Sequence, residues 1–274
     1  MLKQRIITAA ILIPLVVWSI FYASEQGFTS GLAVVLFIAT LEWNNFVNYN
    51  NKASGYIFSV VLILAFLYME HLAELQFIQY AIYLSLVWWL ISIPLLFNFP
   101  FKSSHLLQQK PTKIIIGFVM ILSTFLALNL LRNSQEYGSV YVMYLFIIIW
   151  IADSGAYFAG RKWGKHKLIP NVSPGKSWEG VVGGVIASLV AAFVALDILN
   201  IASSQSVMFI LVTLVTVIYS VVGDLSESMF KRMASIKDSG KILPGHGGIL
   251  DRIDSLTSGL PVFLAGLWLM EKLG

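Results

Sequence analysis

The sequence predicts an all-α, polytopic integral membrane protein with about nine transmembrane helices and a cytoplasmic N-terminus. Three observations lead to this fold class. Hydrophobic residues make up 58% of the 274-residue chain and charged residues only 12%, about half of the ~25% of typical soluble domains. Apolar runs long enough to cross a bilayer follow one another along the chain. Lysine and arginine gather in alternate segments between these runs, as in cytoplasmic loops.

Nine segments approach the roughly 20 apolar residues that a helix needs to cross the hydrocarbon core. The first run follows a basic start and resembles a signal peptide. Large Phe21 and Tyr22 precede Ala23, where small residues would favour cleavage, so we expect an uncleaved first span. The third run is short, and Pro94 could kink the fourth. The predicted spans are 6–22, 28–46, 55–70, 76–97, 114–131, 139–159, 178–199, 206–230 and 255–272.

The distribution of cations predicts the orientation. With nine spans, sixteen of the eighteen Lys and Arg residues fall on the side of the N-terminus, and only Arg132 and Lys272 on the other. This imbalance places the N-terminus in the cytoplasm. One missed or added helix would disturb the alternation, so it also supports the number of spans. Lys102, Lys110 and Lys113 are interpreted as anchors to anionic lipid.

Carboxylates inside the apolar runs point to a functional site. Asp153 lies within the sixth run, and Asp224 and Glu227 lie near the cytoplasmic end of the eighth. Acids at such depths cost a few kcal/mol, so they usually face water or a partner. Asp224, Glu227, Ser228 and Lys231 share one helix face by their spacing. For Glu227, a structural pair with Lys231 four residues later explains the pattern at least as well.

Two further aspartates suggest a metal site. Asp251 and Asp254 are three residues apart at the start of the ninth helix. If the eighth and ninth helices approach, these acids and Asp224 form an oxygen-rich pocket. Mg²⁺ prefers such oxygens and usually keeps water and substrate phosphates as further ligands. We therefore predict Mg²⁺ at Asp224, Asp251 and Asp254, and leave open a second, monovalent or divalent, cation. Cysteine is absent, so thiolate ligands are excluded.

The cytoplasmic segment "KDSGKILPGHGGILDRID" is suited to phosphate handling. Gly245, Gly247 and Gly248 allow tight turns that bring backbone N–H groups close to an anion, although a purely structural turn would explain them equally well. His246 between them is either a phosphate donor or a local structural residue. The side chains expected to act on the phosphates are Lys231, Arg232, Lys237, His246 and Arg252.

The other long basic segment, 160–177, is also expected to bind phosphates. Lys176 stands at the N-terminal edge of the seventh helix, where backbone N–H groups favour anions. Ser173 or Ser177 could cap that helix. The run "SPGKSWEG" lacks the first glycine of a Walker loop, so a soluble-type nucleotide fold is not expected. The predicted cofactor-binding residues are Arg161, Lys165, Lys167, Lys176 and Ser228.

The segment from Ser228 to Asp254 resembles the signature of phosphatidate cytidylyltransferases, also called CDP-diacylglycerol synthases. That signature reads Ser-x-x-Lys-Arg, four residues, Lys-Asp, then Leu-Pro-x-His-Gly-Gly-x-x-Asp-Arg-x-Asp. The block around this segment covers roughly 220–260, and residues 151–184 resemble a second block of the same family, whereas the first 130 residues resemble it mainly as a string of spans. The matching positions are Ser228, Lys231, Arg232, Lys237, Asp238, Leu243, Pro244, His246, Gly247, Gly248, Asp251, Arg252 and Asp254.

The resemblance implies the conversion of CTP and phosphatidate into CDP-diacylglycerol and pyrophosphate, for phospholipid biosynthesis. It implies Mg²⁺ dependence, a homodimer, and metal binding at Asp224 and Asp251. The site would face the cytoplasm from the inner membrane, because CTP is soluble and phosphatidate lies in the bilayer. We expect one membrane domain, 1–274, with N-terminal spans in 1–131 and a catalytic half in 132–274 that carries the loops 160–177 and 231–254.

Three other functions compete with this reading. A cation transporter would use Asp153 and Asp224 as an ion path, but it leaves the Gly/His/Asp/Arg loop without a purpose. A CDP-alcohol phosphotransferase would carry the hallmark Asp-Gly-x-x-Ala-Arg, which this sequence lacks. A CTP-dependent lipid kinase is related in chemistry, and its products distinguish it.

Overall fold

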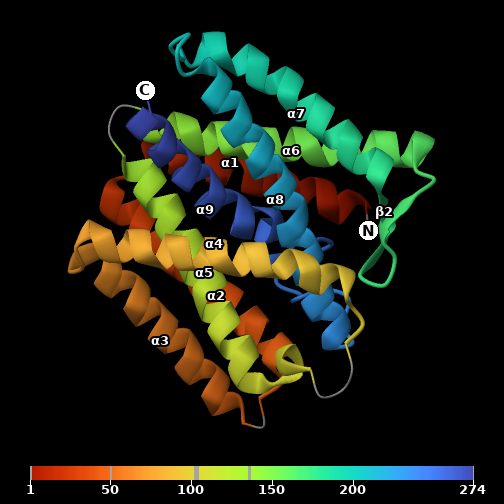
Figure 1. Cartoon of the computed structure of the whole chain (residues 1–274). Helices are drawn as coiled ribbons and strands as arrows, with labels where there is room; N and C mark the ends of the chain where they lie inside the picture. The colour runs from red at the N-terminus through yellow and green to blue at the C-terminus, as the bar shows by residue number, and fades with distance from the viewer. Residues whose placement is uncertain (1, 50, 102–104, 135–136, 274) are drawn as a thin grey trace.

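The computed structural model describes residues 2–49, 51–101, 105–134 and 137–273 (Figure 1). Within these residues, nine long helices follow the nine predicted spans in order and extend most of them by a few residues. Pro94 lies inside the fourth helix without ending it. The helices are α1 (Leu2–Tyr22), α2 (Glu25–Val47), α3 (Lys52–His71), α4 (Leu75–Phe97), α5 (Lys110–Asn133), α6 (Gly138–Trp163), α7 (Trp178–Ile198), α8 (Ser206–Met233) and α9 (Leu250–Leu273).

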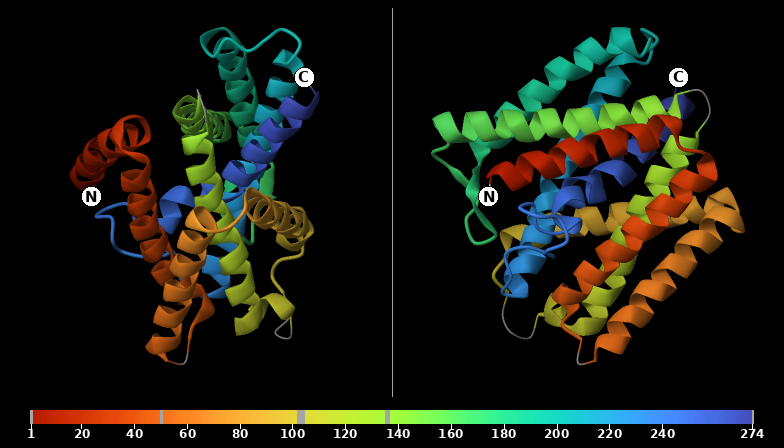
Figure 2. Two further views of the ribbon diagram at one scale, coloured as in Figure 1. Left: turned by 90° about the vertical axis from the view of Figure 1, so that its left-hand side faces the viewer. Right: turned by 180° about the vertical axis from the view of Figure 1, so that it is seen from behind.

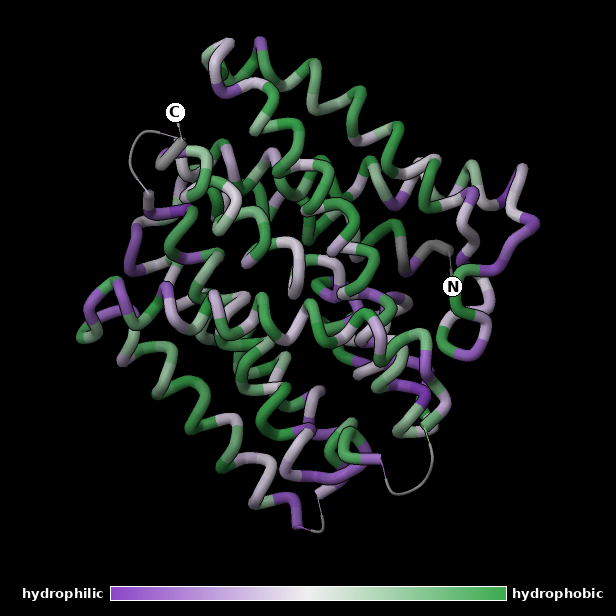
Figure 3. Tube along the Cα trace, in the orientation of Figure 1, coloured by the Kyte–Doolittle hydropathy of each residue, from purple (hydrophilic) through white to green (hydrophobic). Residues whose placement is uncertain are grey.

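The remaining regular structure is small. A 3₁₀ turn, η1 (Leu106–Gln108), precedes α5. An antiparallel hairpin of β1 (Lys167–Ile169) and β2 (Ser173–Ser177) joins α6 to α7, and we did not predict it. Eight of the described helices are long and apolar enough to cross a membrane, and the apolar part of α1, Ile6–Tyr22, is shorter. Hydrophilic residues gather mainly in loops and at helix ends (Figure 3). The predicted all-α, polytopic membrane fold is therefore confirmed.

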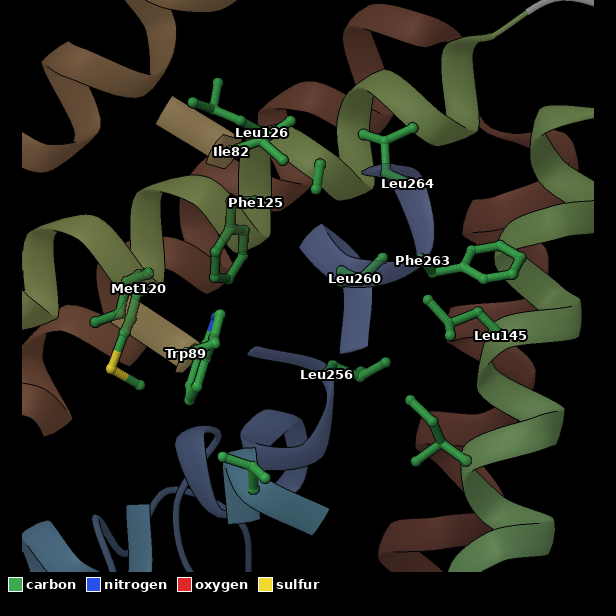
Figure 4. Close-up of a cluster of buried hydrophobic side chains, with 14 of the residues drawn as sticks. Ile82, Trp89, Met120, Phe125, Leu126, Leu145, Leu256, Leu260, Phe263 and Leu264 are labelled. Carbon is green, nitrogen blue, oxygen red and sulfur yellow. The ribbon is translucent and has the colours of Figure 1, made fainter. Parts of the chain in front are cut away.

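Helices α5 and α9 form the centre of the bundle. Two thirds of the apolar stretch of each helix is buried, compared with 22% for α7. Leu260 and Phe263 of α9 are fully buried among side chains of the surrounding helices (Figure 4). Helix α7 lies on the outside against α6 and α8, and α1 runs along α6 (Figure 2). Since α9 begins at Leu250, the central position of this helix also fixes the position of Asp251 and Asp254.

Small residues bring α6 and α7 close together. A methyl group on Gly183 would lie 2.2 Å from Ala159 Cβ, and one on Gly184 would lie 2.7 Å from the Ala152 carbonyl oxygen. Membrane helices associate through such small residues because lipid offers no hydrophobic driving force between them. This tight packing sets the place of the β1–β2 hairpin, which leads directly into α7.

The segments predicted to share one side of the membrane meet at one end of the bundle. Four contacts bring these segments together across long distances in the sequence, two of them through the span ends at Thr8 and Asn45, so the predicted alternation of the loops agrees with the three-dimensional arrangement. The contacts are Thr8 Oγ1 to the Pro244 carbonyl (3.0 Å), Asn45 Nδ2 to the Ser239 carbonyl (2.8 Å), Asn171 Nδ2 to the Phe99 carbonyl (3.3 Å) and Arg232 Nε to the Val172 carbonyl (3.2 Å).

Two cations outside the site have structural roles. Arg132, predicted on the opposite side, donates to the carbonyls of Ile20 (3.1 Å) and Ala23 at the end of α1. Lys113 is buried, and its Nζ donates to the Phe46 carbonyl at 2.9 Å near the end of α2. The prediction that Lys113 anchors lipid is therefore wrong, because a side chain that caps a helix inside the protein does not reach headgroups. Lys102 and the side chain of Lys272 lie outside the described residues.

Candidate active site

The acidic residues of α6, α8 and α9 meet where α8 and α9 touch through their backbones. A methyl group on Gly223 would lie 2.5 Å from the Asp254 carbonyl oxygen and 2.4 Å from Ser258 Oγ, so only glycine permits this approach. Asp153 and Asp254 both lie within electrostatic range of Asp224. Three carboxylates from three helices therefore form one acidic cluster.

This acidic cluster is accessible and is flanked by cations. Lys176 Nζ lies 2.6 Å from Asp224 Oδ2, and both side chains are 27% exposed. Ser228 Oγ lies 3.4 Å from Asp224 Oδ1, which confirms that these two residues share one helix face. Arg252 is exposed and within electrostatic range of Asp153. A polyanionic ligand could therefore bind to Lys176 and Arg252 here, while a cation that accompanies the ligand binds to the carboxylates of the cluster.

A second group of charges is buried beside the cluster. Lys231 Nζ lies 2.8 Å from Asp251 Oδ1 and 3.2 Å from Glu227 Oε1. All three residues are at most 9% exposed. The Glu227–Lys231 pair expected from the spacing is confirmed, and Asp251 joins it from α9. Buried charges of this kind require their partners, since an unpaired one is strongly destabilising.

Asp251 also organises the loop between α8 and α9. Its Oδ2 accepts hydrogen bonds from Ser239 N (2.9 Å), Ser239 Oγ (2.9 Å) and Gly248 N (2.8 Å). Both oxygens of Asp251 are thus engaged by the protein, whereas Asp224 faces the accessible side. Direct metal binding by Asp251 stays a prediction, and it would require Lys231 to give way.

Glu42 of α2 reaches the same loop, and our sequence analysis missed it. Its carboxylate accepts hydrogen bonds from Ile249 N (3.0 Å) and Leu250 N (2.8 Å), and Ser239 Oγ, which also reaches Asp251, lies 3.1 Å from it. Glu42 is only 3% exposed. The signal was present, because Glu42 is a carboxylate inside the second apolar run, like Asp153 in the sixth.

The glycine-rich loop itself has a clear local structure. Gly245 and Gly247 adopt φ values of 78° and 86°, which favour glycine. The Leu243 and Gly247 backbones form a bridge that closes the turn. The backbone N–H groups of Gly248, Ile249 and Leu250 meet Asp251 and Glu42, so the anions at these groups are the protein's own carboxylates.

His246 projects from this turn. Its backbone N–H donates to the Leu243 carbonyl at 2.9 Å. Its ring Nδ1 is buried and has no hydrogen-bond partner among the described residues. The turn is therefore closed by backbone bonds and does not use this ring nitrogen, which leaves the role of the imidazole as a prediction.

The β1–β2 hairpin separates the predicted phosphate-binding cations. Lys176 of β2 turns toward Asp224. Lys165 and Lys167 instead line a groove of about 930 Å³ between the end of α6 and the start of α7. Of the two serines that the sequence offered as caps, Ser177 caps α7, with its Oγ accepting from Gly180 N at 3.2 Å. The other residues of the groove include Trp163, His166, Trp178, Glu179, Val182 and Ile186.

The remaining predicted residues lie around these sites. Arg161 is exposed and donates to the Tyr157 hydroxyl at 3.1 Å. Arg232 is exposed and holds the β1–β2 loop through the Val172 carbonyl, and Lys237 is exposed on the α8–α9 loop. The structure thus brings Lys176, Ser228 and Arg252 to the acidic cluster, and it places Lys165 and Lys167 in the groove.

The donor set of the acidic cluster fits a hard divalent cation. In the part of the chain that the structure describes, no group of three or more His, Asp or Glu side chains is arranged to hold a metal ion alone. Asp224 and Asp254 offer carboxylate oxygens from adjacent helices, and Mg²⁺ is usually held by one or two carboxylates together with water and substrate phosphates. The residues present are therefore suited to an ion that arrives with a phosphate ligand.

The fold and this site define a polytopic membrane protein with an accessible cluster of carboxylates and cations at one end of its helices. Residues 3–270 match the family model described as "Cytidylyltransferase family". The chain belongs to this family.

Relatives of known name agree with the family. The chain is 38% identical over 282 residues to "Phosphatidate cytidylyltransferase" of Haemophilus influenzae, covering 96% of this chain and 97% of the relative. It is also 38% identical over 268 residues to the protein of that name from Pseudomonas aeruginosa, covering 98% and 97%. The protein of that name from Bacillus subtilis is 41% identical over 154 residues, covering 53% and 56%.

Proposed function

We propose that the protein transfers the cytidylyl group of CTP to phosphatidate and forms CDP-diacylglycerol and pyrophosphate for phospholipid biosynthesis. Membership of the family and nearly full-length similarity to phosphatidate cytidylyltransferases support this function. The single structural observation that carries it is the 2.6 Å contact between Lys176 and Asp224. This contact joins the two sequence blocks that resemble the family, at the end of the bundle where the basic loops meet.

The reaction requires positioning more than proton transfer. A phosphate oxygen of phosphatidate forms a bond to the α-phosphorus of CTP, the bond from that phosphorus to the β-phosphate oxygen breaks, and pyrophosphate leaves. A phosphate monoester has a second pKa of about 6, so the nucleophile is largely ionised at neutral pH without a strong base. The task of the protein is to bring two polyanions together and to balance the leaving charge.

We assign these tasks to the residues at the acidic cluster and around it. Lys176, Arg252, Arg232 and Lys237 bind phosphates, and Lys231 holds Asp251 in place. Asp224 and Asp254 would hold Mg²⁺, with Asp251 as the third predicted ligand. Mg²⁺ bound there supplies positive charge to the phosphates.

The groove is the proposed place where phosphatidate binds as it enters the site from the membrane. Trp163 and Trp178 suit the membrane interface, where tryptophan is enriched. Lys165 and Lys167 would meet the phosphate of phosphatidate, while Val182 and other apolar residues of α7 would meet its acyl chains. CTP then occupies the Asp224 side of the hairpin. We further propose that this side faces the cytoplasm from the inner membrane and that the protein is a homodimer, the latter from the family resemblance alone.

The test is product formation by purified protein in detergent with CTP, Mg²⁺ and phosphatidate. Asp224→Asn should lower turnover at least about 100-fold, because it removes a charge that balances Lys176 and that would hold the cation. Glu74→Gln, an exposed acid outside the site, is the matched control and should keep full turnover. Absence of CDP-diacylglycerol with correctly folded protein would refute the function, and near-normal turnover of Asp224→Asn would remove Asp224 from the site.

A further inference from the structure

We propose that Glu42 is a positioning residue for the reaction: from α2 it holds the α8–α9 loop and the first turn of α9, and it thereby fixes Asp251. Its effect on turnover rests on the proposed function. The residue lies in the N-terminal spans, outside both sequence blocks that resemble the family. The inference therefore assigns part of the catalytic framework to a helix that the sequence analysis treated only as a span.

The environment of the Glu42 carboxylate supports this role. Glu42 is 3% exposed and has no cation within ion-pair distance among the described residues. Its charge is instead met by the N–H groups of Ile249 and Leu250 at the start of α9. A helix N-terminus carries unpaired donors and a partial positive charge, so a buried carboxylate is stabilised there. Glu42 thus accepts hydrogen bonds from the N–H groups at the start of α9. A capping residue next to the helix in the sequence usually has this role, whereas Glu42 comes from another helix.

Two glycines of the α8–α9 loop leave space for the Glu42 carboxylate. A methyl group on Gly240 would lie 2.3 Å from Glu42 Oε1, and one on Gly248 would lie 2.4 Å from Glu42 Oε2. Neither glycine has a positive φ, so backbone conformation does not require glycine at these positions. The loop leaves room for the carboxylate at both places, which indicates that Glu42 and the loop fit each other specifically.

Ser239 connects Glu42 to Asp251. Ser239 Oγ lies 3.1 Å from Glu42 Oε2 and 2.9 Å from Asp251 Oδ2. A hydroxyl has one proton, so it donates to one carboxylate at a time and links the two. Asp251 in turn holds Lys231 at 2.8 Å. A short chain of contacts therefore runs from α2 through the loop to α8, and a shift of Glu42 reaches Asp251 through one residue.

Glu42 acts through the loop and does not touch the accessible cluster. Its carboxylate contacts backbone N–H groups and Ser239, and its side chain is enclosed by the loop. Loss of its charge should therefore leave Lys176 and Asp224 in place. We expect the KM for CTP to change little and kcat to fall. Rates are normalised to the amount of folded protein, so a lower yield of folded protein would not by itself lower kcat.

The experiment compares Glu42→Gln with Glu42→Asp and with the control Glu74→Gln in full-length protein. Hydrogen exchange of the peptide that covers residues 239–250 reports the loop without any reference to activity. Loss of a charged hydrogen-bond acceptor corresponds to about a 10- to 100-fold effect. In Glu42→Gln we expect exchange of this peptide to rise by at least about tenfold and kcat to fall by a similar factor. Glu42→Asp, which keeps the charge, should recover part of both.

The outcomes separate this proposal from the proposed function. Unchanged exchange in Glu42→Gln would show that Glu42 does not hold the loop, and faster exchange with normal kcat would show that the reaction does not need the loop held; either result overturns the inference. If the unaltered protein forms no product, the proposed function fails while the exchange result still reports the loop. Should Glu42→Gln not fold, Gly240→Ala serves instead: its methyl group, 2.3 Å from Glu42 Oε1, should displace the carboxylate, speed exchange of the loop peptide and lower kcat, and unchanged exchange would overturn the inference.

Discussion

Lys231 offers the most informative single perturbation of the buried charges. Its Nζ lies between Asp251 Oδ1 at 2.8 Å and Glu227 Oε1 at 3.2 Å, and its side chain is 11% exposed. Lys231→Met keeps a similar length but removes the charge. Two buried carboxylates then remain without their cation.

The structure predicts which of the two carboxylates accounts for most of the lost stability when Lys231 is removed. Removing one partner of a buried ion pair destabilises a protein by about 3–5 kcal/mol. Asp251 keeps hydrogen bonds from Ser239 and Gly248 on its other oxygen, so its charge stays partly compensated. Glu227 is 2% exposed and loses its cation. We therefore expect Glu227→Gln to restore at least half of the lost free energy of unfolding when combined with Lys231→Met.

The assay is equilibrium unfolding in mixed detergent micelles, with helical circular dichroism as the signal. Lys52→Met, at the exposed first residue of α3, is the control and should change the free energy of unfolding by no more than about 0.5 kcal/mol. If the effects of Lys231→Met and Glu227→Gln simply add, Glu227 does not depend on Lys231. That result would refute the reasoning about the buried group.

Two packing predictions can be measured with the same unfolding assay. Gly117→Ala should lower the free energy of unfolding by about 1–3 kcal/mol, because the new methyl group would lie 2.1 Å from Trp43 Nε1. Gly31→Ala, where nothing lies within 4 Å, is its control and should be neutral or stabilising; equal effects of both would contradict the packing of α2 against α5. Gly183→Val should force α6 and α7 apart at Ala159, and limited proteolysis should then cleave the β1–β2 hairpin faster than in the unaltered protein.

The helices could be predicted from the sequence because the bilayer imposes their length and the cations impose their alternation. Predicted spans such as 178–199 and 206–230 differ from α7 and α8 by a few residues at most. The β1–β2 hairpin could not be predicted in this way. Its second strand, Ser173–Ser177, has a proline, a glycine and no alternation of apolar residues, so its pairing depends on the fixed ends of α6 and α7.

The sequence supplied the residues of the candidate site, but it could not supply the contacts among them. Spacing placed Asp224 beside Ser228 and Glu227 beside Lys231 along α8, and the structure shows both contacts. Spacing along α9 could not decide whether Asp251 or Asp254 would lie next to Asp224, because that depends on how α9 is rotated against α8. The close approach at Gly223 settles it in favour of Asp254. Glu42 contributes from about 200 residues earlier in the chain, a relation that no local pattern contains.

The different surroundings of the three aspartates suggest how the site divides its work. Asp251 receives hydrogen bonds from Ser239, Gly248 and Lys231, so an incoming cation would have to displace several donors to reach it. Asp224 has Lys176 and a long contact with Ser228, and it lies on the accessible side. A phosphate that attracts Lys176 would release Asp224 for a cation at the same step. Nucleotide and metal are then expected to bind cooperatively. In Lys176→Gln, the bound nucleotide should raise the affinity for the metal less than in the unaltered protein, and the bound metal should likewise raise the affinity for the nucleotide less.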